Sequence, residues 1–146
     1  MAALLGYGFA GHGFTQDSNQ FSVGYGLGAG YVFPSNVYLG GTLLRYLGPP
    51  EGEDESEYDT FTLDLEVGYE IGKGPFSVRP SLGLGALLSI ITSEDSAGSG
   101  IRPQLVPAVL AQYSLGIVRI GAEARYTLVM SYPDALALLG SAGVAF

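Results

Sequence analysis

Residues 61–71 read FTLDLEVGYEI and alternate two kinds of side chain without interruption. Successive side chains of a β-strand point to opposite faces, so this alternation predicts a strand with two unlike faces. One face is apolar and carries Phe61, Leu63, Leu65, Val67, Tyr69 and Ile71. The other face is small or acidic and carries Thr62, Asp64, Glu66, Gly68 and Glu70. A soluble sheet would turn the apolar face inward, whereas a membrane barrel would turn it outward.

The composition favours a single all-β domain that spans residues 1–146. Hydrophobic residues make up 47% of the chain and charged residues 14%, with 23 glycines, 10 tyrosines and 7 phenylalanines. The chain contains no cysteine, which excludes disulfide and thiolate chemistry. Its longest uncharged stretch, 18–44, is interrupted by glycines and a proline, which argues against a transmembrane helix. No secretory signal pattern opens the sequence, which indicates a mature or an engineered chain.

Further runs of alternating residues predict seven more strands. They cover residues 3–13, 21–33, 37–47, 76–90, 103–114, 118–130 and 136–146. The connections between strands alternate between long and short. They lie at 14–20, 34–36, 48–60, 72–75, 92–100, 115–116 and 131–134. This pattern predicts an up-and-down meander with long loops at one end and tight turns and both termini at the other. Pro80, Pro103 and Pro107 fall within predicted strands, where their missing backbone donors should cause bulges or a weakened seam.

The volume of the side chains decides which face of these strands points inward. An eight-stranded barrel has an interior only just wide enough for its inward side chains. The apolar faces hold most of the Phe, Tyr, Leu and Val residues, which would not fit there. The opposite faces are rich in glycine and serine and leave room for charged side chains. We therefore predict an eight-stranded antiparallel transmembrane β-barrel, apolar outside and polar and glycine-rich inside.

Two groups of residues follow from this orientation. The predicted polar network of the lumen comprises His12, Arg45, Asp64, Glu66, Glu70, Arg79, Gln104, Gln112, Arg119, Glu123 and Arg125. Its arginines and acidic residues are equal in number, and we expect them to pair across the lumen. Residues 37–47 are apolar on both faces, so we orient them by Arg45, which places Tyr38 and Tyr46 outside. The predicted aromatic girdle at the membrane interfaces comprises Tyr7, Tyr25, Tyr31, Tyr38, Tyr46, Tyr69, Tyr113 and Tyr126.

The most specific pattern lies at the end of the chain. Leu138, Gly140, Ala142 and Val144 form an alternating outward set that closes on Phe146. Over essentially its whole length the chain resembles the small eight-stranded outer-membrane barrels of the OmpA, OmpX and OmpW type. The resemblance implies a monomer in the bacterial outer membrane, with a lipid bilayer or detergent around it and a lumen plugged by Arg and Glu side chains. It also implies that the outer-membrane assembly machinery reads Phe146 as a recognition signal.

No residue pattern predicts catalysis, a cofactor or a metal site. His12 is the only histidine, and no catalytic triad spacing accompanies it. The acidic segment at 51–59, EGEDESEYD, lacks the ligand and glycine spacing of a calcium loop. The alternate glycines at 24–30 lack the strand-to-helix context of a phosphate-binding loop. The net charge of −8 disfavours nucleic acid as a partner.

We therefore expect a non-enzymatic barrel that serves as a membrane anchor displaying its acidic loops, or as a narrow and largely plugged pore. Two alternatives from other functional classes remain open. The first is a soluble lipocalin-like barrel that binds an apolar small molecule, and the second is a lipid-modifying outer-membrane enzyme. Dependence on detergent for folding separates the expected protein from the soluble alternative, because a soluble barrel would remain monodisperse without it.

Overall fold

All the regular elements that the structure describes are β-strands. The computed structural model describes residues 2–10, 23–47, 57–93, 96–130 and 134–145, and for 2–10, 57–59 and 91–98 it describes only the backbone. The strands are β1 (Ala2–Ala10), β2 (Val23–Val32), β3 (Val37–Leu47), β4 (Glu57–Tyr69), β5 (Ile71–Lys73), β6 (Phe76–Ser93), β7 (Ser96–Leu115), β8 (Val118–Val129) and β9 (Ala135–Val144). Within these described ranges, no helix is long and apolar enough to cross a membrane.

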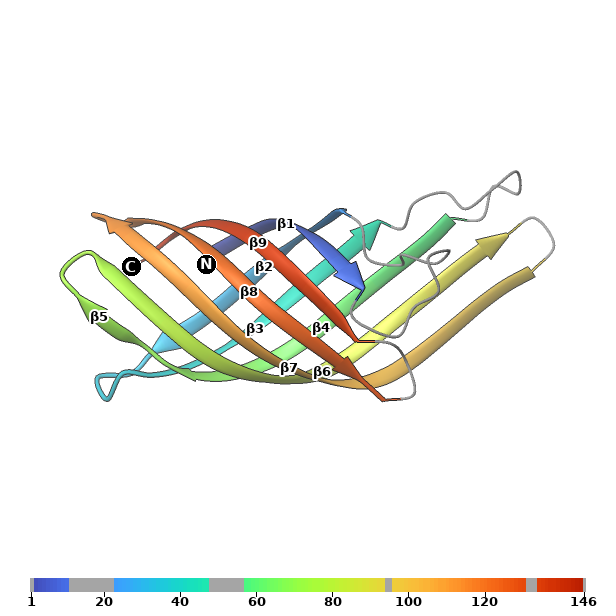
Figure 1. The fold of residues 1–146 in the computed structure, drawn as a ribbon, viewed down its shortest axis with the longest axis horizontal. Coiled ribbons are helices and arrows are strands. Elements are labelled where there is room, and N and C mark those ends of the chain that lie inside the picture. The colour runs from blue at the N-terminus through green and yellow to red at the C-terminus, as the bar shows by residue number, and fades with distance from the viewer. Residues whose placement is uncertain (1, 11–22, 48–56, 94–95, 131–133, 146) are drawn as a thin grey trace.

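The strands close into a barrel (Figure 1). Antiparallel pairing runs in the order β4, β3, β2, β1, β9, β8, β7, β6, and the pairing of β4 with β6 completes the ring. The short β5 continues β4 along β6 in the same register, since Gly68 pairs with Ser81 and Ile71 pairs with Val78. β4 and β5 therefore act as one strand of the barrel. The predicted eight-stranded antiparallel up-and-down fold is confirmed.

Two prolines interrupt the ladders of the barrel. Opposite Pro80, the pairing of β6 lapses between the end of β4 and the start of β5. At Pro107, β7 likewise loses its pairing with β8 for a short stretch. Both gaps have the same cause, because proline has no N–H group to donate to a neighbouring strand. The register is the same on either side of each gap, so the predicted weakened seam is confirmed at Pro80 and Pro107, whereas these two ladders contain no bulge and Pro103 stays paired with Ala86.

The loop end of the barrel differs from the prediction because its strands run farther. β6 and β7 keep pairing with each other as far as Ser93 and Ser96, beyond the point where β8 ends. Figure 1 shows this hairpin projecting past the end of β8. The predicted connection at 92–100 is therefore wrong, and β4 begins at Glu57, inside the predicted connection at 48–60. Residues 48–56, which include most of the acidic segment, lie outside the described residues.

The opposite end of the barrel carries the tight turns. Asn36, Gly74 and Gly116 have positive φ angles of 64°, 63° and 66°. Glycine adopts this conformation without steric cost, and asparagine is among the few other residues that tolerate it. β1 and β9 lie side by side at this end, with Ala2 paired to Gly143 (Figure 1). The predicted gathering of tight turns and chain ends on one side of the barrel is confirmed.

The outer face of the barrel is apolar. On β4, four alternate side chains are exposed there, namely Leu63, Leu65, Val67 and Tyr69, and Leu65 is 71% accessible. Register places Leu39 beside Val67 and Val67 beside Leu82, so the exposed side chains form a continuous surface. Other members of this surface are Leu27, Leu43, Leu63, Leu84, Val109, Ile120 and Leu138. Soluble monomers rarely expose an apolar surface of this extent, and the predicted outward orientation of the apolar face of β4 is confirmed.

Candidate functional site

Apolar side chains fill the part of the lumen nearest the loop end. Seven buried residues from β3, β6, β8 and β9 form one cluster, termed here the apolar plug: Leu44, Tyr46, Leu87, Val129, Ala135, Ala137 and Leu139. Leu44 and Leu87 are completely inaccessible to solvent. This section of the barrel is therefore packed by its own side chains, as expected for an interior of this width.

Midway along the barrel, Arg125 forms ion pairs with three carboxylates. Its Nη2 lies 2.6 Å from Glu66 Oε1, its Nε lies 2.9 Å from Glu123 Oε1, and its Nη1 lies 3.6 Å from Asp64 Oδ2. These four residues, termed the Arg125 cluster, come from β4 and β8 and are all buried. Three formal negative charges thus face one guanidinium. Buried charges are tolerated only when paired, so the arginine holds the cluster together.

Neutral neighbours complete the hydrogen bonding of the Arg125 cluster. Thr42 Oγ1 donates a 2.7 Å hydrogen bond to Glu66 Oε1, and Gln104 Nε2 donates a 2.6 Å hydrogen bond to Asp64 Oδ1. On β6, Gly85 lies directly beside Asp64 in the ladder. A Cβ atom at position 85 would contact Asp64 Oδ1 and the backbone of β4. The glycine therefore leaves the space that this carboxylate occupies.

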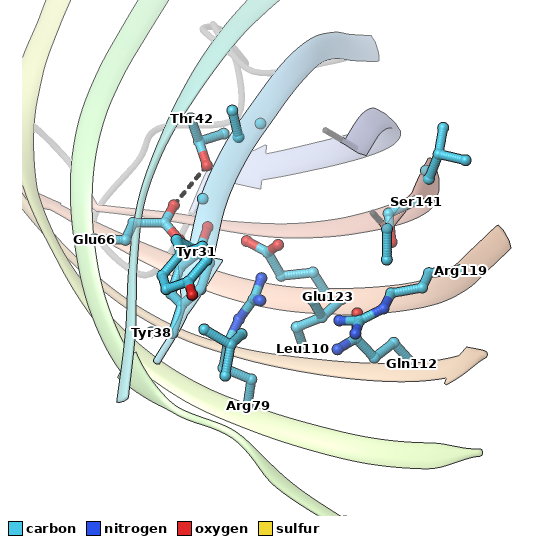
Figure 2. Close-up of a pocket in the computed structure, with 17 residues that line it drawn as sticks. Tyr31, Tyr38, Thr42, Glu66, Arg79, Leu110, Gln112, Arg119, Glu123 and Ser141 are labelled. Carbon is cyan, nitrogen blue, oxygen red and sulfur yellow. Dashed lines mark hydrogen bonds between the residues drawn. The ribbon is translucent and has the colours of Figure 1, made fainter. Parts of the chain in front are cut away.

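A cavity of about 290 Å³, termed the vestibule, lies between the Arg125 cluster and the turn end of the barrel (Figure 2). Arg79 and Arg119 line it, and their Nη1 atoms lie 3.8 and 3.6 Å from Glu70 Oε2. The same oxygen accepts a 3.0 Å hydrogen bond from Gln112 Nε2. The guanidinium carbon of Arg79 lies 3.5 Å from the ring centre of Tyr38, a cation–π contact. The vestibule is thus a polar, arginine-rich space.

Tyr38 and Tyr46 face the lumen, so their predicted place in the outer girdle is wrong. Both side chains are buried, with exposures of 5% and 2%. Each ring lies against a glycine of β2: a Cβ atom on Gly24 would lie 2.6 Å from the Tyr46 ring, and one on Gly30 would contact the Tyr38 ring. The alternate glycines of β2 create space inside the barrel, and large side chains of β3 fill it.

Arg45 lies on the outer face, so its predicted place in the lumen is also wrong. Its Nη1 donates a 3.0 Å hydrogen bond to the hydroxyl oxygen of Tyr25, and its guanidinium carbon lies 5.4 Å from the ring centre of Phe61. Arg45 lies two residues from the loop end of β3. A long arginine side chain at that position can lie along apolar surface and still reach polar groups. The charge of Arg45 therefore does not show which face of β3 points into the lumen.

The remaining predicted lumen residues fall into two groups. The Arg125 cluster and its neighbours hold Asp64, Glu66, Gln104, Glu123 and Arg125, and the vestibule and its surroundings hold Glu70, Arg79, Gln112 and Arg119. The remaining predicted girdle residues that the structure describes lie on the outer face, namely Tyr25, Tyr31, Tyr69, Tyr113 and Tyr126. His12, Phe146 and the side chain of Tyr7 lie outside the described residues.

Sequence reasoning missed several interior residues. Thr42 and Leu44 share the inward face of β3 with the two tyrosines, and they escape prediction because Arg45 points the other way. Arg102 precedes the predicted strand at 103–114 but lies in β7, on the same face as Gln104. The glycines of β2 carry a usable signal, since a face with four successive glycines needs large partners from the next strand.

Comparisons with known proteins agree with this architecture. No family model and no curated protein matches the chain. The solved structure of the neisserial surface protein NspA superposes with a TM-score of 0.78 and 14% sequence identity, covering 99% of this chain and 94% of that one. Ail, the attachment invasion locus protein of Yersinia pestis in complex with the heparin analogue sucrose octasulfate, gives a TM-score of 0.70 and 18% identity, covering 99% and 97%. The chain has the fold of the small eight-stranded outer-membrane β-barrels.

Two further members of this fold show its functional range. The N-terminal β-barrel domain of OprF from Pseudomonas aeruginosa gives a TM-score of 0.64 and 17% identity, covering 97% of this chain and 92% of that one. The outer-membrane enzyme PagL gives 0.54 and 11%, covering 99% and 98%. One small outer-membrane barrel fold thus hosts different activities, so function has to be argued from the side chains of this chain.

The interior offers ionic and hydrogen-bonding groups. The part of the chain that the structure describes contains no histidine and no cysteine, and it has no group of three or more His, Cys, Asp or Glu placed to hold a metal ion. What the described interior can supply is guanidinium groups, carboxylates and amides that face a cavity. Such groups suit the binding of a polar solute.

Proposed function

We propose that the chain is an integral, non-enzymatic β-barrel of the bacterial outer membrane. The observation that supports this most strongly is the orientation of the strand faces, which is the reverse of that in a soluble protein. Leucine and valine side chains cover the outside, while Arg125 and three carboxylates are buried inside. Lipid favours such an outer surface, and a closed barrel leaves no unpaired strand edge within the hydrocarbon. The same arrangement in water would expose apolar surface and bury charge.

The outward-facing tyrosines support this placement. Tyr25 and Tyr126 lie near the loop end, whereas Tyr31, Tyr69 and Tyr113 lie near the turn end. Tyr25 and Tyr31 lie towards opposite ends of β2. Outer-membrane barrels carry aromatic girdles at both membrane interfaces, on either side of the apolar band. The tyrosines therefore suit the two membrane interfaces, with the acidic loops displayed beyond one of them.

The interior argues against the soluble alternative and offers no support for a catalytic one. A lipocalin-like barrel keeps an apolar cavity for its ligand, whereas the centre of this barrel holds the Arg125 cluster. The described residues contain no histidine or cysteine to act as a base or nucleophile. We infer that the barrel anchors and displays its loops and assembles as a monomer. Leu138 and Val144 are exposed on β9, which suits an outward assembly signal that ends at Phe146.

Refolding with and without an amphiphile tests the proposed function. The chain is unfolded in urea and diluted into plain buffer, into detergent micelles or into lipid vesicles. We expect β-structure by circular dichroism and a single species only with micelles or vesicles, because the outer surface is apolar. A folded, monodisperse protein in plain buffer would instead support the soluble alternative.

Conduction is expected to be negligible. The apolar plug fills the lumen towards the loop end, and the Arg125 cluster crosses it at mid-height. In planar-bilayer recordings we expect silence or brief small currents, and we expect larger currents when Tyr46 and Leu87 are both replaced by alanine. Leu84→Ala serves as a control, because Leu84 lies on the outer face and should leave the recordings unchanged. Stable, porin-sized current steps from the unaltered chain would contradict a plugged lumen.

A further inference from the structure

The vestibule has room for a small ligand. Its volume of about 290 Å³ is close to the lower limit for ligand pockets, which suits a molecule of a few heavy atoms to dipeptide size. Glycines line one side, among them Gly28 and Gly30 of β2 and Gly143 of β9. Tyr31 and Val144 line it at the tips of their strands, so the cavity reaches the turn end of the barrel. Neither the apolar plug nor the Arg125 cluster obstructs entry from that end.

One part of the vestibule carries two guanidinium groups that share one carboxylate. Arg79 and Arg119 both approach Glu70, but at 3.8 and 3.6 Å these contacts are ion pairs too long for hydrogen bonds. Neither guanidinium donates a hydrogen bond to any residue that the structure describes. Figure 2 shows both side chains directed into the cavity. Their N–H groups are therefore available to a carboxylate bound between them.

The inner end of the vestibule carries negative groups. Glu66 and Glu123 both line the cavity, and each meets Arg125 through its Oε1 atom. The Oε2 atom of each accepts no hydrogen bond from a described residue. Together with Asp64, these carboxylates outnumber the single arginine that binds them. An ammonium group would satisfy the free oxygens and compensate the excess negative charge.

Arg119 is separated along the barrel from the carboxylates of the inner end. Arg119 and Glu123 share the inward face of β8 and lie four residues apart, which is about 13 Å of strand. Their long side chains shorten the gap between the charged groups. A two-residue peptide spans at most about 7 Å. A ligand with charges at both ends, rather than one with a single charge, matches this spacing.

We propose that the vestibule binds a small zwitterion, such as a short peptide or an amino acid. Its carboxylate lies between Arg79 and Arg119, and its ammonium group lies against Glu66 and Glu123. A simple anion would leave the carboxylates of the inner end facing a like charge, and a simple cation would leave two guanidinium groups sharing the single carboxylate of Glu70. The site does not depend on the proposed membrane role, because it is built from residues inside the barrel.

Glycylglycine is the probe for this proposal. It is titrated into the full chain folded in detergent micelles, and binding is followed by amide chemical shifts in NMR spectra. Saturable shifts are expected at the turn-end halves of β2, β8 and β9. N-acetylglycylglycine keeps only the carboxylate and glycylglycinamide keeps only the ammonium group. Each should bind about ten-fold more weakly or worse, since a charged hydrogen-bonding group is lost.

A matched pair of arginine variants identifies the site. Arg119→Gln should weaken glycylglycine binding by about ten-fold and remove its advantage over glycylglycinamide. Arg119 lies outside the Arg125 cluster and its side chain is 36% exposed, so this variant should fold. Arg45→Gln makes the same chemical change on the outer face and should leave binding unaltered. The proposal is overturned by an absence of saturable shifts, by equal affinity for a singly charged analogue, or by unchanged affinity in Arg119→Gln.

Discussion

Replacing Arg125 with leucine is expected to lower the free energy of unfolding by about 3–5 kcal/mol. Arg125 is 1% exposed and forms ion pairs with Asp64, Glu66 and Glu123. Its removal leaves three buried carboxylates without a compensating charge, and desolvated charges without partners are strongly destabilising. Urea titrations of the barrel in lipid vesicles, extrapolated to zero denaturant, measure the change.

Two further variants separate charge compensation from lost packing. Neutralising the whole Arg125 cluster, with Arg125→Leu, Asp64→Asn, Glu66→Gln and Glu123→Gln together, should recover most of the lost stability, because no buried charge remains. Arg119→Gln should cost no more than about 1 kcal/mol, since Arg119 is partly exposed and its ion pair is long. If the Arg125→Leu barrel were as stable as the parent, the prediction that Arg125 compensates the charge of the three buried carboxylates would be wrong.

Replacing Leu65 with arginine is expected to cost about 2–4 kcal/mol of folding free energy in a bilayer. Leu65 is 71% exposed at the middle of the apolar outer face, so the proposed membrane placement puts position 65 in hydrocarbon. A charged group there cannot reach water without deforming the bilayer. The measurement is the same urea titration in vesicles, and folding in detergent micelles should be affected less.

A second arginine substitution, placed nearer the membrane interface, is the control for the Leu65→Arg prediction. Leu115 is the last residue of β7, next to a tight turn, and is 56% exposed on the same outer face. Leu115→Arg should cost only about 0–1 kcal/mol, because a charge near the interface stays hydrated. Equal costs at the two positions would contradict a bilayer that spans the middle of the barrel. A negligible cost at position 65 would contradict the outward-facing belt itself.

Alternation along single strands determined most of the fold. In β4, β6, β8 and β9 most large apolar residues alternate with small or charged ones, and the structure turns this set outward in each, whereas Leu87, Val129 and Leu139 point into the lumen. The period of two is a local property of the extended backbone, so no knowledge of neighbouring strands is required. Because the interior of a narrow barrel has little volume, only the strand face with small side chains can point inward. Strand number, direction and most inward residues could therefore be predicted.

Only the tertiary structure decided the orientation of β3 and the contacts inside the barrel. β3 is apolar on both faces, and Tyr38 and Tyr46 turn inward because Gly24 and Gly30 leave space on a neighbouring strand. That space depends on the register between two strands. Likewise, the pairing of Arg125 with Glu66, 59 residues away, requires the barrel to close around them. A sequence pattern shows which residues of one strand lie on the same face. The stagger between neighbouring strands decides which of those residues meet at the same height in the barrel.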